Sequence, residues 1–163
     1  MKEIYENIVY KLLEACKLYY GDRLISFCLF GSVARETMSN ESDIDFLIVV
    51  KNLPVGRVER TLEFLNIERN LMQVLIEARR KGIYTGFSPV IKTPEEVQMG
   101  SLLFLDMLED GKILFDRDDF LKKYFEKFRE KLKSLGAKRV KTGDAWHWVL
   151  KSDYKPDEIF EIL

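Results

Sequence analysis

Residues 29–50 read Leu-Phe-Gly-Ser-Val-Ala-Arg-Glu-Thr-Met-Ser-Asn-Glu-Ser-Asp-Ile-Asp-Phe-Leu-Ile-Val-Val. The apolar run Leu24 to Phe30 predicts a buried strand, which stops at Gly31-Ser32 because a residue without a Cβ permits a sharp turn. Ser32 is expected to cap a short helical turn that continues to Glu36. The N–H groups at the start of such a turn point outward and suit a phosphate.

A second strand is predicted from Asp43 to Val50, and it opens on two carboxylates. Alternate residues of a strand share a face, so Asp43 and Asp45 should project the same way, about 6 to 7 Å apart at ~3.3 Å per residue. The residues expected on the other face are apolar: Ile44, Phe46, Ile48 and Val50.

Two carboxylates beside a Gly-Ser turn are typical of a site for metal-bound triphosphate. Mg²⁺ prefers oxygen ligands and is usually held by one or two carboxylates together with substrate phosphates. Two such ions about 3.5 to 4 Å apart stabilise both the attacking and the leaving oxygen of an in-line displacement. A plain surface turn ending in Ser-Asp is the alternative. The catalytic interpretation is favoured because Gly31-Ser32, Arg35 and the Asp-x-Asp pair occur together, each close to an apolar strand.

Gly31-Ser32-Val33-Ala34-Arg35 followed by Ser42-Asp43-Ile44-Asp45 resembles the signature of the nucleotidyltransferase superfamily that includes DNA polymerase β. The short chain is most similar to the minimal nucleotidyltransferases, often the antitoxin partners of HEPN-domain proteins. The resemblance implies that Gly31 and Ser32 contact the phosphates of ATP, and that Asp43 and Asp45 hold Mg²⁺. Two departures stand out: Glu36 occupies a position that is usually Gly, and a third carboxylate, expected on a later strand, has no obvious counterpart.

The resemblance implies transfer of a nucleotidyl group, AMP from ATP, to a hydroxyl acceptor such as a tyrosine of a HEPN-domain toxin. Arg35 is predicted either to reach a phosphate or to pair with Glu36 or Glu41. The alternative function is a non-catalytic, nucleotide-binding antitoxin-like module that acts by protein contact. Homo-oligomerisation is left open.

Length and composition predict a single domain with a packed core, and the resemblance implies an α/β fold with a small mixed sheet backed by helices. The chain has 163 residues, of which 47% are hydrophobic. The nucleotidyltransferase domain is expected over residues 1–135, and residues 136–163 are expected to form an arm packed on the same domain. No apolar run of about 18 residues and no signal-peptide pattern occurs, so a cytoplasmic protein without a membrane span is expected. Cys16 and Cys28 lack metal-ligand spacing, which predicts two buried thiols.

Hydrophobic periodicity and turn residues place the remaining elements. Helices are expected over Lys2 to Tyr20, Arg57 to Lys81, Pro94 to about Asp110 and Asp116 to Leu135, and strands over Ile83 to Lys92 and Lys112 to Phe115. Pro89 should place the first of these strands at a sheet edge or a bulge. Residues 57–81 carry apolar side chains on two faces, which indicates either burial on both sides or contact with a partner.

Other functional classes are excluded by what the sequence lacks. His147 is the only histidine, which rules out zinc sites built on several histidines, and no nucleophile elbow or Walker loop is present. Between Arg117 and Lys141 there are ten Lys or Arg against four Asp or Glu. This segment is interpreted as a solvated helix face or as a surface for an anionic partner such as tRNA. Because the net charge of the chain is −1, little nucleic-acid binding is expected at physiological salt.

Overall fold

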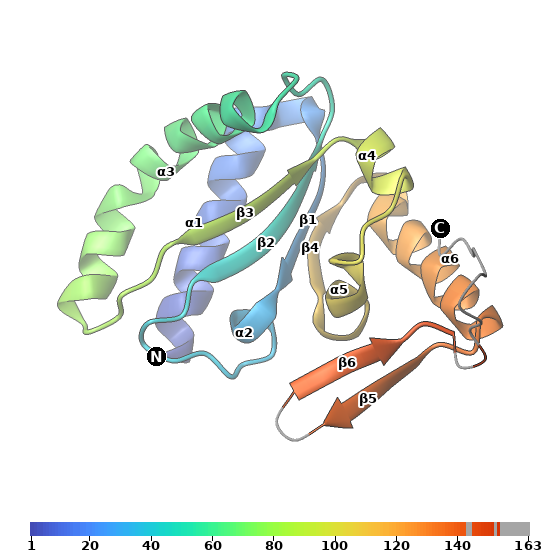
Figure 1. Ribbon diagram of the computed structural model, residues 1–163. Helices are drawn as coiled ribbons and strands as arrows, with labels where there is room; N and C mark the ends of the chain where they lie inside the picture. The colour runs from blue at the N-terminus through green and yellow to red at the C-terminus, as the bar shows by residue number, and fades with distance from the viewer. Residues whose placement is uncertain (143–144, 152, 154–163) are drawn as a thin grey trace. The chain divides into compact units, whose positions relative to one another are not determined.

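The computed structural model describes residues 1–142, 145–151 and 153, which fall into two compact units, Met1–Leu121 and Lys122–Leu163 (Figure 1). The elements of the first unit are α1 (Lys2–Tyr20), η1 (Gly21–Arg23), β1 (Leu24–Phe30), α2 (Gly31–Ala34), β2 (Ile44–Val50), α3 (Arg57–Arg80), β3 (Phe87–Lys92), α4 (Pro94–Gln98), α5 (Phe104–Asp110), β4 (Lys112–Asp116) and η2 (Arg117–Asp119). Helix α6 (Phe120–Ser134) leads into the second unit, whose strands are β5 (Lys138–Thr142) and β6 (Ala145–Val149).

The first unit is built on a four-stranded sheet with the order β3-β2-β1-β4. Strand β1 is antiparallel to both β2 and β4, whereas β2 and β3 are parallel. The sheet is therefore mixed, and the predicted α/β class is confirmed. Pro89 lies on the edge strand β3, as predicted. Proline has no N–H to donate, and an edge strand tolerates this because only one of its sides is paired.

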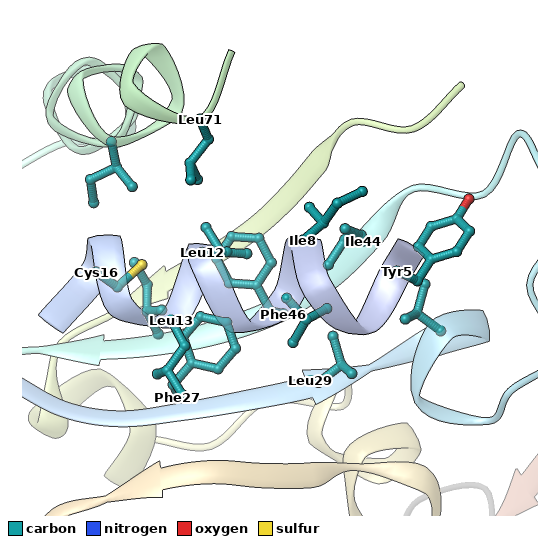
Figure 2. Packing of buried hydrophobic residues seen from close by; sticks show 14 of the residues in the cluster. Tyr5, Ile8, Leu12, Leu13, Cys16, Phe27, Leu29, Ile44, Phe46 and Leu71 are labelled. Atoms are coloured by element: carbon teal, nitrogen blue, oxygen red, sulfur yellow. The ribbon is translucent and has the colours of Figure 1, made fainter. Parts of the chain in front are cut away.

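One face of the sheet is covered by α1 and α3, and the main hydrophobic core lies between these layers (Figures 1 and 2). The predicted apolar face of β2 is confirmed, because Ile44, Phe46, Ile48 and Val50 are all fully buried in this core. Phe46 stacks on Phe27 of β1 with ring centroids 5.2 Å apart. Asp45 lies on the opposite face because it alternates with Ile44 and Phe46 along β2. Helices α4 and α5 lie on that side of the sheet (Figure 1).

Helix α3 buries one of its two apolar faces and exposes the other. Phe64, Ile67, Leu71, Val74 and Ala78 are buried, whereas Leu62 is 57% exposed and Met72 48% exposed. Of the two alternatives for this segment, burial on both sides is therefore wrong for the single chain.

The bounds of several predicted elements differ from the structure for identifiable reasons. The helix expected from Asp116 begins at Phe120 instead, because Asp118 and Asp119 adopt positive φ values of 55° and 54°. The helix expected from Pro94 to Asp110 is split into α4 and α5, because Gly100 adopts a φ of +81° that a continuing helix cannot accommodate. Helix α4 starts with a capping box, in which Thr93 Oγ1 accepts from the Glu96 N–H and the Glu96 carboxylate accepts from the Thr93 N–H. Strand β3 begins at Phe87 instead of Ile83, because the backbone before it bonds to the loop that precedes β2: the Tyr84 N–H donates to the Asn40 carbonyl at 2.7 Å.

The second unit contains the predicted basic helix and an antiparallel hairpin. Trp146, His147 and Trp148 lie on β6. In the first unit, both cysteines are buried thiols, as predicted. No helix within the described ranges is long and apolar enough to cross a membrane.

Candidate functional site

The turn between β1 and α2 places a glycine directly against a carboxylate. Gly31 has a φ of +71°, in the region that favours glycine. A Cβ on Gly31 would overlap Oδ2 of Asp45 and would lie 3.0 Å from its Cγ. Gly31 is therefore required twice, once for its backbone conformation and once for the space that the Asp45 side chain takes.

Asp45 is the second residue of β2, and Asp43 lies just before this strand, which begins at Ile44 and not at Asp43 as predicted. Asp45 is half-buried and is flanked in the register by Phe30 on β1 and Ser88 on β3. Asp43 is exposed, and its Oδ1 accepts a hydrogen bond of 3.0 Å from the Gly86 N–H. Each of the two predicted metal ligands is thus positioned by contact with backbone.

The loop that carries the chain from α2 to Asp43 is held in place by a buried tyrosine. The Tyr5 hydroxyl on α1 lies 2.9 Å from the Ser39 carbonyl and 2.8 Å from the Ser42 carbonyl, so its single proton serves one of them at a time. Burial raises the pKa of Tyr5, which keeps the hydroxyl protonated and able to donate. This anchor was not found from the sequence, where Tyr5 was not singled out.

The short helix α2 differs in one detail from the sequence prediction. Its N-cap residue is Phe30, and no side chain donates or accepts a capping hydrogen bond, so the predicted Ser32 cap is wrong. The turn is closed by backbone alone, with the Arg35 N–H donating to the Gly31 carbonyl at 3.1 Å and the Thr37 N–H to the Ser32 carbonyl at 3.0 Å.

Arg35 forms its ion pair with a residue distant in sequence. Its Nη1 lies 3.5 Å from Oδ2 of Asp110 at the end of α5, and neither predicted partner, Glu36 or Glu41, pairs with it. The Arg35 side chain is 42% exposed. The ion pair connects the end of α5 to the turn. A local sequence pattern cannot predict it, because the two residues are far apart in the chain.

Glu36 occupies a strained backbone position and is held by two lysines. Its φ is +61°, which explains why Gly is usual at this point of the signature. Lys2 Nζ lies 2.8 Å from Oε2 and Lys112 Nζ 3.1 Å from Oε1. These hydrogen bonds, first Lys2 and then Lys112, lower the pKa of Glu36.

The chemistry of this site suits a hard divalent cation that is shared with a polyphosphate. Asp43 and Asp45 supply carboxylate oxygens, and Mg²⁺ needs no more than one or two of these when substrate phosphates and water complete its shell. Residues 1–142, 145–151 and 153 hold no cluster of three or more His, Cys, Asp or Glu that could bind a metal. On β3, the position beside Asp45 is taken by Ser88, so the third carboxylate that the resemblance implies is not found there.

The comparisons with known proteins show the family of this chain. A family model described as a nucleotidyltransferase domain matches residues 9–96, which include all five predicted site residues. A Methanocaldococcus jannaschii protein named as a protein adenylyltransferase is 35% identical over 137 residues, 82% of this chain and 87% of the relative.

Two solved structures resemble this fold at low sequence identity. One is a mutant of the toxin–antitoxin MntA–HpeT, with a TM-score of 0.50, 14% identity and coverage of 78% of this chain and 91% of that chain. The other is the spectinomycin adenyltransferase of Enterococcus faecialis with ATP and spectinomycin, with a TM-score of 0.49, 14% identity and coverage of 80% and 66%.

Proposed function

Because this chain belongs to the nucleotidyltransferase domain family, we propose that it transfers a nucleotidyl group, AMP from ATP, to a hydroxyl acceptor with release of pyrophosphate. The observation that supports this proposal is the contact of Gly31 with Asp45, which are the residues proposed for phosphate binding and for metal binding.

The roles of the residues follow from their positions. Asp43 and Asp45 would hold Mg²⁺, which neutralises phosphate charge and polarises the phosphoryl oxygens when bound. The backbone at Gly31 and Ser32 would bind the phosphates, with the Asp45 side chain directly beside Gly31. Arg35 would add a positive charge next to this turn. Phosphoryl transfer needs positioning and charge stabilisation more than covalent chemistry, and these residues supply both.

We propose that the acceptor is a protein hydroxyl, specifically a tyrosine of a HEPN-domain toxin. A protein acceptor is supported by the 35% identical relative, which is named as a protein adenylyltransferase. The HEPN toxin and its tyrosine rest on the resemblance to minimal nucleotidyltransferases. An intracellular enzyme that uses ATP and Mg²⁺ fits this role.

A second candidate is favoured by Ser88, the residue beside Asp45 on β3. If the missing third carboxylate abolishes turnover, the chain would bind nucleotide and silence its partner by contact alone. The two functions predict the same fold and the same partner, and they differ only in whether the partner is modified.

A partner assay distinguishes the two functions. The wild type and the double variant Asp43→Asn with Asp45→Asn are each incubated with Mg-ATP and the HEPN-domain protein, whose intact mass is then measured. We expect an added adenylyl mass with the wild type alone. The matched control is Asp106→Asn with Glu109→Gln, which removes two exposed carboxylates of α5 and should leave transfer unchanged.

Two further measurements make each outcome informative. Thermal melting of the double variant should match or exceed that of the wild type, because removing two neighbouring negative charges relieves repulsion. Mg-ATP should raise the melting temperature of the wild type, since a ligand at a hundred times its Kd stabilises the fold by ~2.7 kcal/mol. If both proteins silence the partner and neither changes its mass, the chain acts as a binding module and the proposed enzyme activity is wrong.

A further inference from the structure

The first unit contains a cavity that the proposed nucleotide site does not use. Its volume is about 360 Å³, within the range of small-molecule pockets. It lies between α1, β1, β4 and the segment that follows Gly31-Ser32, and it is lined by Lys2, Tyr5, Glu6, Val9, Leu13, Leu29, Val33, Met38 and Leu114 among others. None of Gly31, Ser32, Arg35, Asp43 or Asp45 lines it.

Helix α1 forms one wall because it carries two neighbouring stripes of side chains. Tyr5, Ile8, Leu12 and Cys16 recur at three and four residues and are fully buried in the core. The adjacent stripe of Lys2, Glu6, Val9, Tyr10 and Leu13 faces the cavity. Along this second stripe the side chains change from charged at the N-terminal end to apolar and aromatic further along the helix.

The opposite wall repeats the same gradient on β4. Lys112 and Leu114 both line the cavity, although the pairing of β4 with β1 is irregular at Leu114. Leu114 is 40% exposed and Tyr10 on α1 is 64% exposed, whereas Val9, Leu13 and Leu29 at the cavity are buried. The cavity therefore has an apolar part with two exposed apolar side chains at its rim, and a separate polar end.

The polar end carries two lysines and two glutamates, and the lysines keep N–H donors that an anionic head group can take. Lys2 and Lys112 converge on Glu36, and each of the two carboxylate oxygens of Glu36 already accepts a bond from one lysine. Each ammonium has three N–H donors and spends one of them on Glu36. The nearest further acid, Glu6, lies 3.9 Å from Lys2, beyond hydrogen-bond distance.

We propose that this cavity binds a small amphipathic molecule whose apolar body lies between α1 and β4 and whose anionic head group is bound by Lys2 and Lys112. The apolar body covers Leu114 and Tyr10, and the head group takes the remaining lysine donors. Because Val33 of α2 is part of the wall, the bound molecule contacts the helix that begins with the proposed phosphate-binding turn.

Binding is measured on the full chain by fluorescence titration with anilinonaphthalene sulfonate, which combines an aromatic body with an anionic group. We expect saturable binding of one molecule. Leu114→Glu should weaken it by at least about tenfold, because a carboxylate in the apolar part would lose its water. The control is Leu18→Glu, since Leu18 is 87% exposed on another side of α1 and should leave affinity unchanged.

The head group is tested by displacement with three ligands that share one tail: octanoate, octanol and octylammonium. We expect octanoate to displace the probe at the lowest concentration and octylammonium at the highest. Tyr10→Glu replaces Leu114→Glu if thermal melting shows that the latter does not fold. Equal affinity of the wall variant and Leu18→Glu, or preference for octylammonium, would overturn the proposal. None of these readouts depends on nucleotide transfer.

Discussion

The side chain of Asp45 occupies the space that a Cβ on Gly31 would need. The two residues come from different elements, the turn after β1 and the second position of β2, and they meet because Asp45 pairs with Phe30 in the antiparallel register. The proposed phosphate turn and the proposed metal ligand are thus one packed unit, and a change at Gly31 acts on both.

We predict that Gly31→Ala abolishes nucleotide transfer and destabilises the fold. The φ of +71° costs an L-residue about 1 to 2 kcal/mol, and the new methyl group additionally displaces Asp45. Chemical denaturation and the transfer assay measure the two effects. Gly82→Ala is the matched control, because Gly82 has a φ of +80° with nothing within 4 Å of its Cβ position.

The excess cost of Gly31→Ala over Gly82→Ala isolates the contact with Asp45. Combining Gly31→Ala with Asp45→Gly should remove this excess, because the carboxylate is no longer there to displace. Equal destabilisation in the two alanine variants, with full activity at Gly31→Ala, would mean that the turn and Asp45 do not act as a unit.

Glu36 gives a second prediction. Its two ion pairs stabilise the fold, whereas its positive φ destabilises it. Glu36→Ala loses both lysine partners and keeps the positive φ, whereas Glu36→Gly loses the partners and relieves the strain. We expect Glu36→Gly to melt at a higher temperature than Glu36→Ala. The opposite order would show that this backbone is not strained.

The pH dependence at Glu36 has a definite sign. Its pKa is lowered by Lys2 and Lys112, so the folded state binds the proton less tightly than the unfolded state. The stabilisation is therefore present above the ordinary glutamate pKa and is lost as the pH falls through the lowered one. Melting of the wild type and of Glu36→Gln should converge in acid, and the difference should shrink with salt.

A third prediction concerns the two thiols. Burial raises the pKa of both Cys16 and Cys28 to about 12, so almost no thiolate exists in the folded protein near neutral pH. An aromatic disulfide reagent should react with them only as fast as the protein unfolds. Because the thiols of the unfolded chain ionise first, the free energy of unfolding should fall as the pH rises above the ordinary cysteine pKa. Rapid reaction of one thiol with the folded protein would contradict the burial.

The sequence predicted those parts of the molecule that depend on neighbouring residues. Helix α1 ends at Tyr20, directly before Gly21, and β1 ends at Phe30, directly before Gly31, both at the predicted positions. The Asp-x-Asp pair, with alternation on β2, was enough to place Asp45 and Ile44 on opposite faces. Periodicity carries this information because it needs no knowledge of the rest of the chain.

The features that the sequence did not reveal depend on contacts between distant segments. Arg35 pairs with Asp110, and Tyr5 anchors the loop before Asp43, although neither partner is near in sequence. The break between α4 and α5 depends on the conformation of Gly100, which apolar spacing alone does not indicate. The residue beside Asp45 on β3 became known only from the parallel register.

That register makes Ser88 the test of the missing carboxylate. Ser88 pairs with Asp45 on the neighbouring parallel strand, so the two side chains lie on the same face of strands about 4.8 Å apart. Ser88 is exposed, and a larger side chain can be accommodated there.

If turnover is limited by the lack of a third acid, Ser88→Asp should raise the rate of nucleotide transfer on the order of tenfold, about 1.4 kcal/mol of barrier. It should also lower the Mg²⁺ concentration at half-maximal activity, because a third carboxylate adds an oxygen ligand. Without Mg²⁺ the variant should melt below the wild type, since the added carboxylate repels Asp45, and the ion should restore the melting temperature. Ser88→Asn is the control, with nearly the same shape and no charge. Indistinguishable rates and Mg²⁺ dependence for Ser88→Asp and Ser88→Asn would show that two carboxylates are all that this site uses.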